Sequence, residues 1–225
     1  MGRNNYFQFK QFRIIQERSA FKVGTDAVLL GSWVSVCSAK RILDVGTGTG
    51  VIALMMAQRS DATITSIEIE KNAAVEAAEN AKNSSWSERL NILNVSFQKF
   101  NEHQPGLFDL IISNPPFFTN SRHSECNLLA MAKHNHLLPP RDLVDGSAGL
   151  LNPGGRLAVI LPVEATPDFI KLAKNAGLFL LRQTEVRPDN RKKPHRCLME
   201  FGKKTGNVEK TFLTIHTDDL SLIHI

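Results

Sequence analysis

The sequence predicts an α/β fold, in which a mostly parallel sheet carries helices on both faces and ends in an antiparallel C-terminal edge. Two observations lead to this prediction. Between residues 41 and 177, short apolar or β-branched segments alternate with helix-like segments, as expected for a parallel sheet. After residue 178, strand-like segments follow one another without a helix between them. The 225 residues are enough to bury a substantial core in one domain.

Periodicity and composition predict the individual elements. Apolar and β-branched runs predict strands at residues 41–45, 63–68, 90–95, 108–113 and 156–161, followed by 179–186, 197–202 and 209–216. Alanine-rich or amphipathic segments predict helices at residues 51–58, 72–82, 141–151 and 167–175. Residues 6–15 alternate aromatic and polar side chains, which predicts a small separate hairpin. We therefore expect one domain over residues 1–225, with an N-terminal extension (1–30), a core (40–216) and an atypical tail (217–225).

Composition argues against several classes of protein. The chain is 42% hydrophobic and 22% charged, which is ordinary for a globular protein. It contains no apolar run of the roughly 18–20 residues that a membrane helix needs, and its first residues lack the apolar core of a signal peptide. Cys37, Cys126 and Cys197 lie far apart and form no metal-binding pattern, and His134 and His136 have too few companions. We expect a cytoplasmic protein without metal or membrane segment.

Basic charge is concentrated near the two ends of the chain. Residues 1–22 hold five basic and one acidic side chains, and residues 182–204 hold eight and three, so these segments carry +4 and +5. Because the whole chain carries +5, the remainder carries −4. A polyanion docked on the two ends would explain this distribution, and two solvated basic faces are the alternative.

A glycine-rich turn, Asp44-Val45-Gly46-Thr47-Gly48-Thr49-Gly50, joins the first strand of the core to its first helix. Glycines there allow a tight turn and the close approach of a ligand. The spacing excludes the dinucleotide pattern G-x-G-x-x-G, and the absence of a lysine excludes a P-loop. The pattern D-x-G-x-G-x-G resembles class I S-adenosylmethionine-dependent methyltransferases, although a generic glycine turn is the alternative. The resemblance implies a Rossmann-like fold with a seven-stranded sheet, and a cofactor bound by Asp44, Gly46, Gly48 and Gly50.

The next two strands end in further candidates for the cofactor site. Glu68 ends the second strand, 24 residues after Asp44, where a carboxylate accepts hydrogen bonds from both ribose hydroxyls of an adenosine; Glu70 is the competing candidate. In the methyltransferases that the turn resembles, an acid at the end of the third strand often contacts the adenine. Ser96 occupies that place here, and Phe97 is expected to pack on the ring or in the core.

The fourth strand ends in Asn114-Pro115-Pro116-Phe117, 64 residues after Gly50. Proline fixes the backbone, so the Asn114 side-chain oxygen and the Pro115 carbonyl are held as two acceptors for a planar amino group. Hydrogen bonds to both amino hydrogens would direct the nitrogen lone pair at a methyl carbon, and Phe117 would stack on the ring that carries the amine. The motif resembles the NPP(Y/F) signature of amino-methyltransferases, which predicts Asn114, Pro115 and Phe117 as the catalytic residues.

Further motifs resemble the tRNA(1)(Val) (adenine-37 N6)-methyltransferase family over roughly residues 6–216. They are Phe7-Gln8-Phe9-Lys10-Gln11-Phe12, the segment from Lys22 to Gly31, Ala132-Lys133-His134 and Pro194-His195-Arg196. The resemblance implies a bacterial cytoplasmic enzyme, expected to be a monomer, that methylates an adenine in a tRNA anticodon loop. Thr25 and Asp26 are expected near the pocket mouth, with a helix N-cap as the alternative for Thr25. The predicted RNA-binding residues are Lys10, Arg13, Arg191, Lys192, Lys193, His195 and Arg196.

Three other functions remain open from the sequence. Guanine 2-amino methyltransferases of ribosomal RNA also use NPPF, but commonly carry an additional domain for which 225 residues leave little room. Release-factor glutamine N5-methyltransferases normally have an N-terminal helical domain, whereas only about 40 residues precede the first core strand here. A non-catalytic RNA-binding relative is the third alternative, and the intact glycines and NPPF argue against it.

Overall fold

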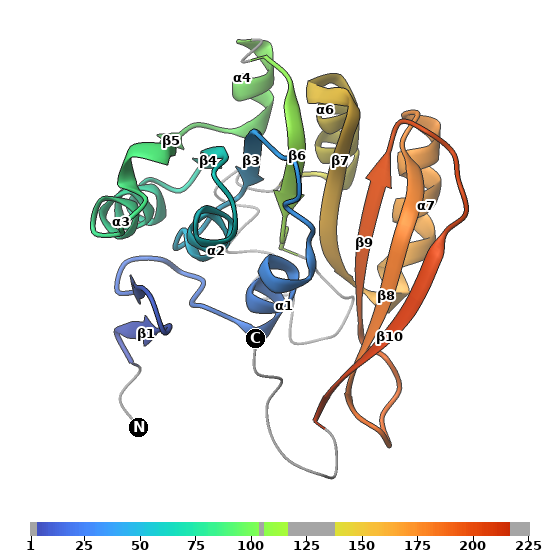
Figure 1. Cartoon of the computed structure of the whole chain (residues 1–225), viewed down its shortest axis with the longest axis horizontal. Helices are drawn as coiled ribbons and strands as arrows, with labels where there is room; N and C mark the ends of the chain where they lie inside the picture. Colours follow the sequence, from blue (N-terminus) through green and yellow to red (C-terminus); the bar gives the residue numbers. More distant parts are fainter. Residues whose placement is uncertain (1–3, 104–105, 117–137, 217–225) are drawn as a thin grey trace.

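The computed structural model describes residues 4–103, 106–116 and 138–216, and an eight-stranded sheet forms its centre. The sheet runs across Figure 1 from β5 at the left to β10 at the right, in the order β5-β4-β3-β6-β7-β9-β8-β10. Its strands are β3 (Arg41–Val45), β4 (Thr63–Glu68), β5 (Leu90–Asn94), β6 (Phe108–Ser113), β7 (Leu151–Pro162), β8 (Phe179–Asp189), β9 (Arg196–Gly202) and β10 (Glu209–His216). The prediction of a mostly parallel sheet in an α/β fold is confirmed.

Helices cover both faces of this sheet, as expected from the alternating pattern. They are α1 (Thr25–Trp33), α2 (Val51–Arg59), α3 (Lys71–Lys82), α4 (Phe97–Glu102), α6 (Pro140–Leu150) and α7 (Thr166–Asn175), with 3-10 turns at Ser87–Arg89 and Val163–Ala165. Ile42 and Leu110 pack with α1 and α2 in one core cluster, while their neighbours Leu43 and Ile111 pack with α4, α6 and α7 in the other. None of the helices in the described ranges has the length and apolar character needed to cross a membrane.

The sheet differs from the prediction in two details. The seven-strand count is wrong, because β10 pairs with β8 and adds an eighth strand. The reversed strand is also not at the edge: β9 runs antiparallel to both β7 and β8, whereas the edge strand β10 is parallel to β8. Strand propensity predicted all three C-terminal strands, but partner and direction depend on long-range pairing.

Three local features differ from the sequence prediction. Helix α1 was considered only through the N-cap alternative for Thr25, because its apolar residues do not recur at helical spacing and give no amphipathic pattern. Helix α4 was missed because it is only six residues long. Strand β7 begins at Leu151, so Pro153 and Gly154 lie within it. A Cβ on Gly155 would lie 2.7 Å from the carbonyl oxygen of Phe108, so glycine allows the two strands to approach there.

The N-terminal segment folds as the predicted hairpin and is attached to α3. Strand β1 (Tyr6–Gln8) pairs antiparallel with β2 (Arg13–Ile15). The buried carboxylate of Glu76 accepts three backbone N–H groups, from residues 17, 18 and 19, at 2.5, 2.6 and 3.0 Å. The buried Asn80 amide bonds to both the N–H and the carbonyl of Ile15, and to the carbonyl of Thr49, each at 2.9 Å. One side chain thus joins the hairpin to the glycine-rich turn.

Candidate cofactor and methyl-transfer site

Three neighbouring parallel strands end at the same level, and the predicted site residues follow directly from them. Val45 of β3 is paired with Ile67 of β4 on one side and with Ser113 of β6 on the other. The next residues along the three strands are Gly46, Glu68 and Asn114. The carboxyl edge of the sheet therefore brings the glycine turn, the candidate ribose ligand and the candidate catalytic residue together, as parallel sheets do at ligand sites.

The glycine-rich turn requires glycine for two different reasons. Gly46, Gly48 and Gly50 have φ angles of +74°, +56° and +83°, in the left-handed region that other residues rarely adopt. A Cβ on Gly50 would lie 3.4 Å from the Cβ of Ala77, so the turn packs closely against α3. A Cβ on Gly46 or Gly48 would meet nothing within 4 Å. Open space therefore lies beside the two glycines nearest the strand end.

Glu68 is held against this turn, which separates it from its competitor Glu70. Its Oε2 accepts the N–H of Gly48 at 2.9 Å, and its Oε1 accepts the N–H of residue 70 at 2.9 Å. The carboxylate of Glu70 instead caps α3 by accepting the N–H groups of Asn72 and Ala73. Each carboxylate thus accepts two backbone N–H groups, but only that of Glu68 reaches the glycine-rich turn, so Glu68 is the better placed of the two candidates and its ribose contact stays a prediction.

Asp44 is fully buried beneath the turn, and only one of its carboxylate oxygens has a partner. Oδ2 accepts a hydrogen bond from the Thr47 hydroxyl at 2.5 Å, while Oδ1 is buried with no partner among the described residues. Burial raises the pKa of Asp44 to about 7, and the nearby Glu68 carboxylate raises it further, against the opposing effects of the Thr47 hydroxyl and of the backbone N–H of Ala53. A cationic or hydrogen-bond-donating ligand group would relieve this unpaired oxygen.

These features fit S-adenosylmethionine better than a phosphate-bearing cofactor. The open side of the turn offers room beside Gly46 and Gly48. Its carboxylates, the buried Asp44 and the turn-facing Glu68, would repel phosphates but attract a cationic ligand with free hydroxyls. Asp44 would face the cationic end of the cofactor, and Glu68 its ribose.

The NPPF motif begins directly after β6, and only part of it lies within the described residues. Asn114 is half-buried, Pro115 is buried and Pro116 is exposed. The Ser113 hydroxyl donates 2.8 Å to the carbonyl of Val45, which ties the end of β6 to the end of β3. Phe117 lies outside the described residues, as do Lys133, His134 and Cys126, so their predicted roles stay predictions.

Ser96 and Phe97 have structural contacts. The Ser96 hydroxyl accepts the N–H of Lys99 at 3.3 Å and caps α4. Phe97 is buried in the core cluster between α4 and α6, where a Cβ on Gly146 would lie 2.4 Å from its ring. The expectation that Phe97 packs in the core is thus supported. A contact of Ser96 or Phe97 with the adenine of the cofactor stays a prediction.

The basic residues of the C-terminal half surround the turn between β8 and β9. Arg191, Lys192 and Lys193 are exposed, and the Lys192 ammonium lies 3.5 Å from a carboxylate oxygen of Asp189. The backbone N–H of Arg191 and the nearby Lys192 hold the pKa of Asp189 below its usual value. His195 is half-buried, and its Nδ1 has no partner among the described residues.

Arg196, predicted as an RNA ligand, is engaged within the protein. Its Nε donates to Oδ2 of Asp26 at 2.8 Å, and both side chains are about one-third exposed, at 32% and 33%. Asp26 lies in the first turn of α1, whose N-cap is Gly24 without a side-chain bond. The N-cap prediction for Thr25 is therefore wrong, since Thr25 is already the first helical residue.

The N-terminal candidates Lys10 and Arg13 are exposed on the hairpin. The Arg13 guanidinium lies 4.7 Å from the centroid of the Tyr6 ring, and its Nε donates to Oε1 of Gln8 at 2.8 Å. Sequence reasoning missed Tyr6 and Gln8 here, and it also missed Glu76 and Asn80. The signal for the latter pair was two polar residues four positions apart among the alanines of a helix that packs against the sheet.

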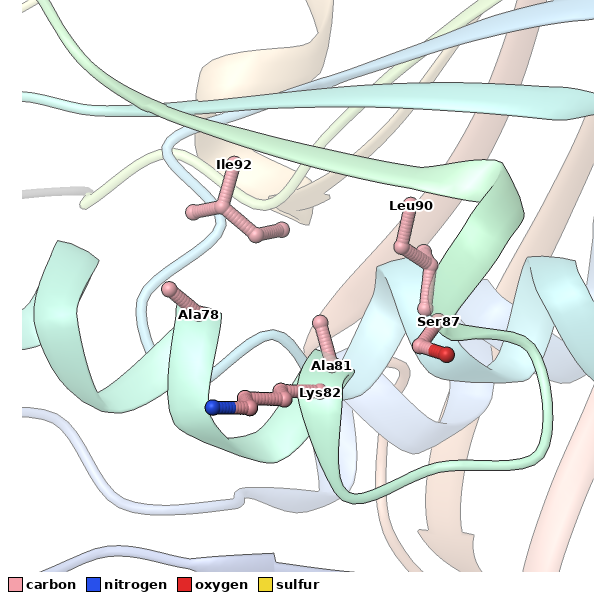
Figure 2. Close-up of a pocket in the computed structure, with 6 residues that line it drawn as sticks. All are labelled: Ala78, Ala81, Lys82, Ser87, Leu90 and Ile92. Atoms are coloured by element: carbon pink, nitrogen blue, oxygen red, sulfur yellow. The ribbon is translucent and has the colours of Figure 1, made fainter.

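A separate small pocket lies away from this edge. Figure 2 shows the pocket, of about 200 Å³, lined by Ala78, Ala81, Lys82, Ser87, Leu90 and Ile92. Leu90 and Ile92 pair with positions 64 and 66 of β4, which precede the carboxyl end of that strand. The pocket contains none of the predicted site residues and is not part of the cofactor site. Across the described ranges, no group of three or more metal-ligating side chains is found.

Known proteins resemble this chain in sequence, and others resemble it in fold. The sequence model of the family "Methyltransferase small domain" matches residues 19–168. A tRNA1(Val) (adenine(37)-N6)-methyltransferase from Trichodesmium erythraeum is 45% identical over 94% of this chain and 90% of that protein. Proteins of the same name are 40% identical in Tolumonas auensis (95% and 90% covered) and 41% identical in Bacteroides fragilis (87% and 83% covered).

Solved structures of methyltransferases have the same fold. The crystal structure of a predicted O-methyltransferase from Agrobacterium tumefaciens has a TM-score of 0.67 at 22% identity, with 88% of this chain and 91% of that chain covered. A SAM-dependent methyltransferase from the same organism has a TM-score of 0.60 at 16% identity, with 91% and 72% covered. The chain belongs to the methyltransferase small domain family and, within it, to the family of the tRNA1(Val) (adenine(37)-N6)-methyltransferases.

Proposed function

We propose that this protein transfers a methyl group from S-adenosylmethionine to the 6-amino group of an adenine in tRNA, at adenine 37 of a valine tRNA. The observation that supports this most directly is the common level of Gly46, Glu68 and Asn114 at the carboxyl edge, in a chain 37–45% identical to proteins with that name. The glycine-rich turn and Asn114 thus follow adjacent strands, β3 and β6, which supports a cofactor beside the target amino group.

Asn114 and Pro115 orient the target amino group. The Asn114 side-chain oxygen and the Pro115 carbonyl accept one amino hydrogen each, which holds the nitrogen lone pair out of the base plane and free to react. When bound, S-adenosylmethionine supplies a methyl group attached to a positively charged sulfur, and the sulfur keeps the electrons of the C–S bond when the methyl group is transferred. After transfer, the nitrogen loses a proton to solvent. Phe117 stacks on the adenine in this proposal, as the NPPF resemblance implies.

The cofactor contacts follow from the turn. Asp44 faces the positively charged end of the cofactor, because its Oδ1 is buried without a partner. Glu68 takes the ribose hydroxyls while its Oε2 remains bonded to the N–H of Gly48. Gly46 and Gly48 leave their open side to the cofactor, and Gly50 keeps the turn against α3. The common position of these residues at the carboxyl edge of the sheet supports their proposed roles in cofactor binding.

The tRNA docks on the two basic segments in this proposal. Lys10 and Arg13 project from the hairpin, and Arg191, Lys192 and Lys193 from the β8–β9 turn, so phosphates of the anticodon arm are contacted from both sides. An anticodon-loop base is unpaired and can be extruded into the site at low cost. We place the reaction in the bacterial cytoplasm and expect a monomer.

The product nucleoside tests the proposal and separates it from its alternatives. The protein is incubated with labelled S-adenosylmethionine and, separately, with unmodified valine tRNA, ribosomal RNA and a release factor. We expect label only with tRNA and, after digestion to nucleosides, only in 6-methyladenosine. Label in 2-methylguanosine, in the release factor, or in none of the substrates would contradict the proposal in favour of one of the three other functions.

A further inference from the structure

The outer face of the β1–β2 hairpin displays an aromatic ring together with a cation. In the antiparallel register, Tyr6 lies opposite Ile15 and Gln8 opposite Arg13, so these four side chains share one face. The intervening positions, Phe7 and Ile14, form the other face, on which Ile14 is completely buried. Tyr6 is 47% exposed, so much of its ring is open to a binding partner.

Contacts within the hairpin hold this face in one geometry. The Arg13 guanidinium stacks on the Tyr6 ring at 4.7 Å, and Gln8 accepts from Arg13 at 2.8 Å. The Gln8 amide in turn donates to the carbonyls of Phe9 and Phe12 across the hairpin turn, at 2.6 and 3.2 Å. The ring, the guanidinium and the amide are therefore pre-ordered, which lowers the entropy cost of binding a planar partner.

The hairpin is also fixed relative to the catalytic edge. Asn80 bonds to the backbone of Ile15, at the end of the outer face, and to the carbonyl of Thr49 in the glycine-rich turn. The rings of Phe9 and Phe12 stack at 4.4 Å, and Phe12 meets Trp86 edge-on at 5.9 Å, which anchors the opposite face. In Figure 1 the chain of β6 runs downward to its carboxyl end, and the hairpin lies on this lower side, beneath α2 and α3.

The charge around this face matches a nucleic acid. Residues 4–22 contain Lys10, Arg13, Arg18 and Lys22 against a single acidic residue, Glu17. Arg18 forms an ion pair with Glu79 of α3, which leaves Lys10, Arg13 and Lys22 as the cations of this segment not offset by that helix. Aromatic rings beside cations bind unpaired nucleotides through stacking and phosphate attraction, without need for a particular base. A second copy of this basic segment would gain less, because its cations would face cations of the same kind.

We infer that the outer face of the hairpin, formed by Tyr6, Gln8 and Arg13, binds an unpaired nucleotide of the tRNA anticodon loop near the target adenine. The base stacks on the exposed part of the Tyr6 ring, Arg13 contacts the adjoining phosphate, and Gln8 keeps Arg13 in place. This inference rests on the proposed tRNA substrate. It adds a stacking site outside the catalytic pocket, fixed to the glycine-rich turn through Asn80, to the phosphate contacts of the basic segments.

Binding of valine tRNA and of its isolated anticodon stem-loop, followed by fluorescence anisotropy at several salt concentrations, tests the inference without methyl transfer. Tyr6→Ala should raise the Kd for both RNAs about 10-fold and leave the salt slope unchanged, because it removes stacking and no charge. Arg13→Ala should lower the salt slope by about one. Tyr6→Phe should bind as the wild type does. The control is Phe212→Ala, which removes a 70% exposed ring from β10 and should change nothing.

The possible outcomes distinguish a failure of the hairpin inference from a failure of the proposed function. Equal Kd values for the wild type, Tyr6→Ala and Phe212→Ala would overturn the inference even if 6-methyladenosine is formed. Wild-type product in a nucleoside other than 6-methyladenosine, with Tyr6-dependent RNA binding, would overturn the proposed function alone. If Tyr6→Ala is too unstable to assay, Tyr6→Leu keeps the apolar contact and should show the same loss. A wild-type dimer that Tyr6→Ala dissociates, with unchanged RNA affinity, would assign the face to a second copy and contradict the inference.

Discussion

Asp26 and Arg196, 170 residues apart in sequence, are joined by a 2.8 Å hydrogen bond between the carboxylate Oδ2 and the guanidinium Nε. The contact links the first turn of α1 to the first residue of β9, at the carboxyl edge of the sheet. Arg196 also donates to the carbonyl of His195, so its donors serve the turn that carries the exposed basic residues. We conclude that Arg196 positions this turn.

The pair predicts a specific pattern of rescue. Asp26→Arg and Arg196→Asp should each lower stability, because each places like charges together, and the double exchange should recover much of the loss. For a pair about one-third exposed we expect a coupling energy of about 1 kcal/mol or less. Urea unfolding of the four proteins measures it. Strictly additive effects of the two single changes would mean that the contact contributes nothing.

The buried carboxylate of Glu76 predicts a large difference between two glutamates of the same helix. Glu76→Gln leaves three backbone N–H groups with a poorer acceptor and should cost about 1–3 kcal/mol of the free energy of unfolding. Glu79→Gln is the matched control, because Glu79 makes only a solvent-screened ion pair with Arg18, and its loss should cost much less than that of Glu76.

Equilibrium unfolding in urea compares the two variants directly. Because Glu76 fixes the segment beside the glycine-rich turn, its variant should also raise the Kd for S-adenosylmethionine in calorimetry, whereas the Glu79 variant should not. Equal losses of stability in the two variants would show that the buried carboxylate has no special role.

The raised pKa of Asp44 predicts how stability changes with pH. A carboxyl group that binds its proton more tightly when folded favours the folded state at low pH, and this contribution is lost as the pH rises from about 4 to about 7. Asp44→Asn does not titrate at this position and does not lose this contribution. The melting temperature of the variant minus that of the wild type should therefore be higher at pH 8 than at pH 5. Thermal unfolding without cofactor measures this difference. A difference that stays constant with pH would refute the buried, partly unpaired state of Asp44.

The positive φ of Gly48 predicts opposite effects for two glycine substitutions. Gly48→Ala places a Cβ at a φ of +56° and should destabilise the protein by about 1–2 kcal/mol. Gly149→Ala in α6 meets nothing within 4 Å and should stabilise it by about 0.5–1 kcal/mol, since alanine favours helix. Urea unfolding measures both, and a neutral Gly48→Ala would argue against the turn conformation.

The parts of the fold that sequence predicts well are those with a local physical cause. The glycines at 46, 48 and 50 were recognisable because only glycine adopts their φ angles readily. The position of Glu68 and Asn114 at one edge of the sheet was predictable because both lie where neighbouring parallel strands end. Apolar runs predicted β10 as a strand, but not its place beside β8, because partner choice depends on the rest of the sheet.

The parts that sequence missed depend on contacts across the chain. Nothing near Arg196 indicates that its partner is Asp26, so a basic cluster was the natural interpretation. Sequence predicted the helix that carries Glu76 and Asn80 but gave these two residues no role, whereas the structure buries them against the N-terminal segment. Helix α1 has no amphipathic pattern because it packs on α2 and also approaches β7.

Single-turnover methyl transfer by Asn114→Ala, with cofactor affinity measured in the same preparation, tests the central claim most directly. The claim is that Asn114 orients the 6-amino group and takes no part in holding the cofactor. The rate of 6-methyladenosine formation in valine tRNA should therefore fall about 100-fold or more, while the Kd for S-adenosylmethionine stays within about threefold of the wild type. A wild-type rate of transfer in the Asn114→Ala variant would contradict the account.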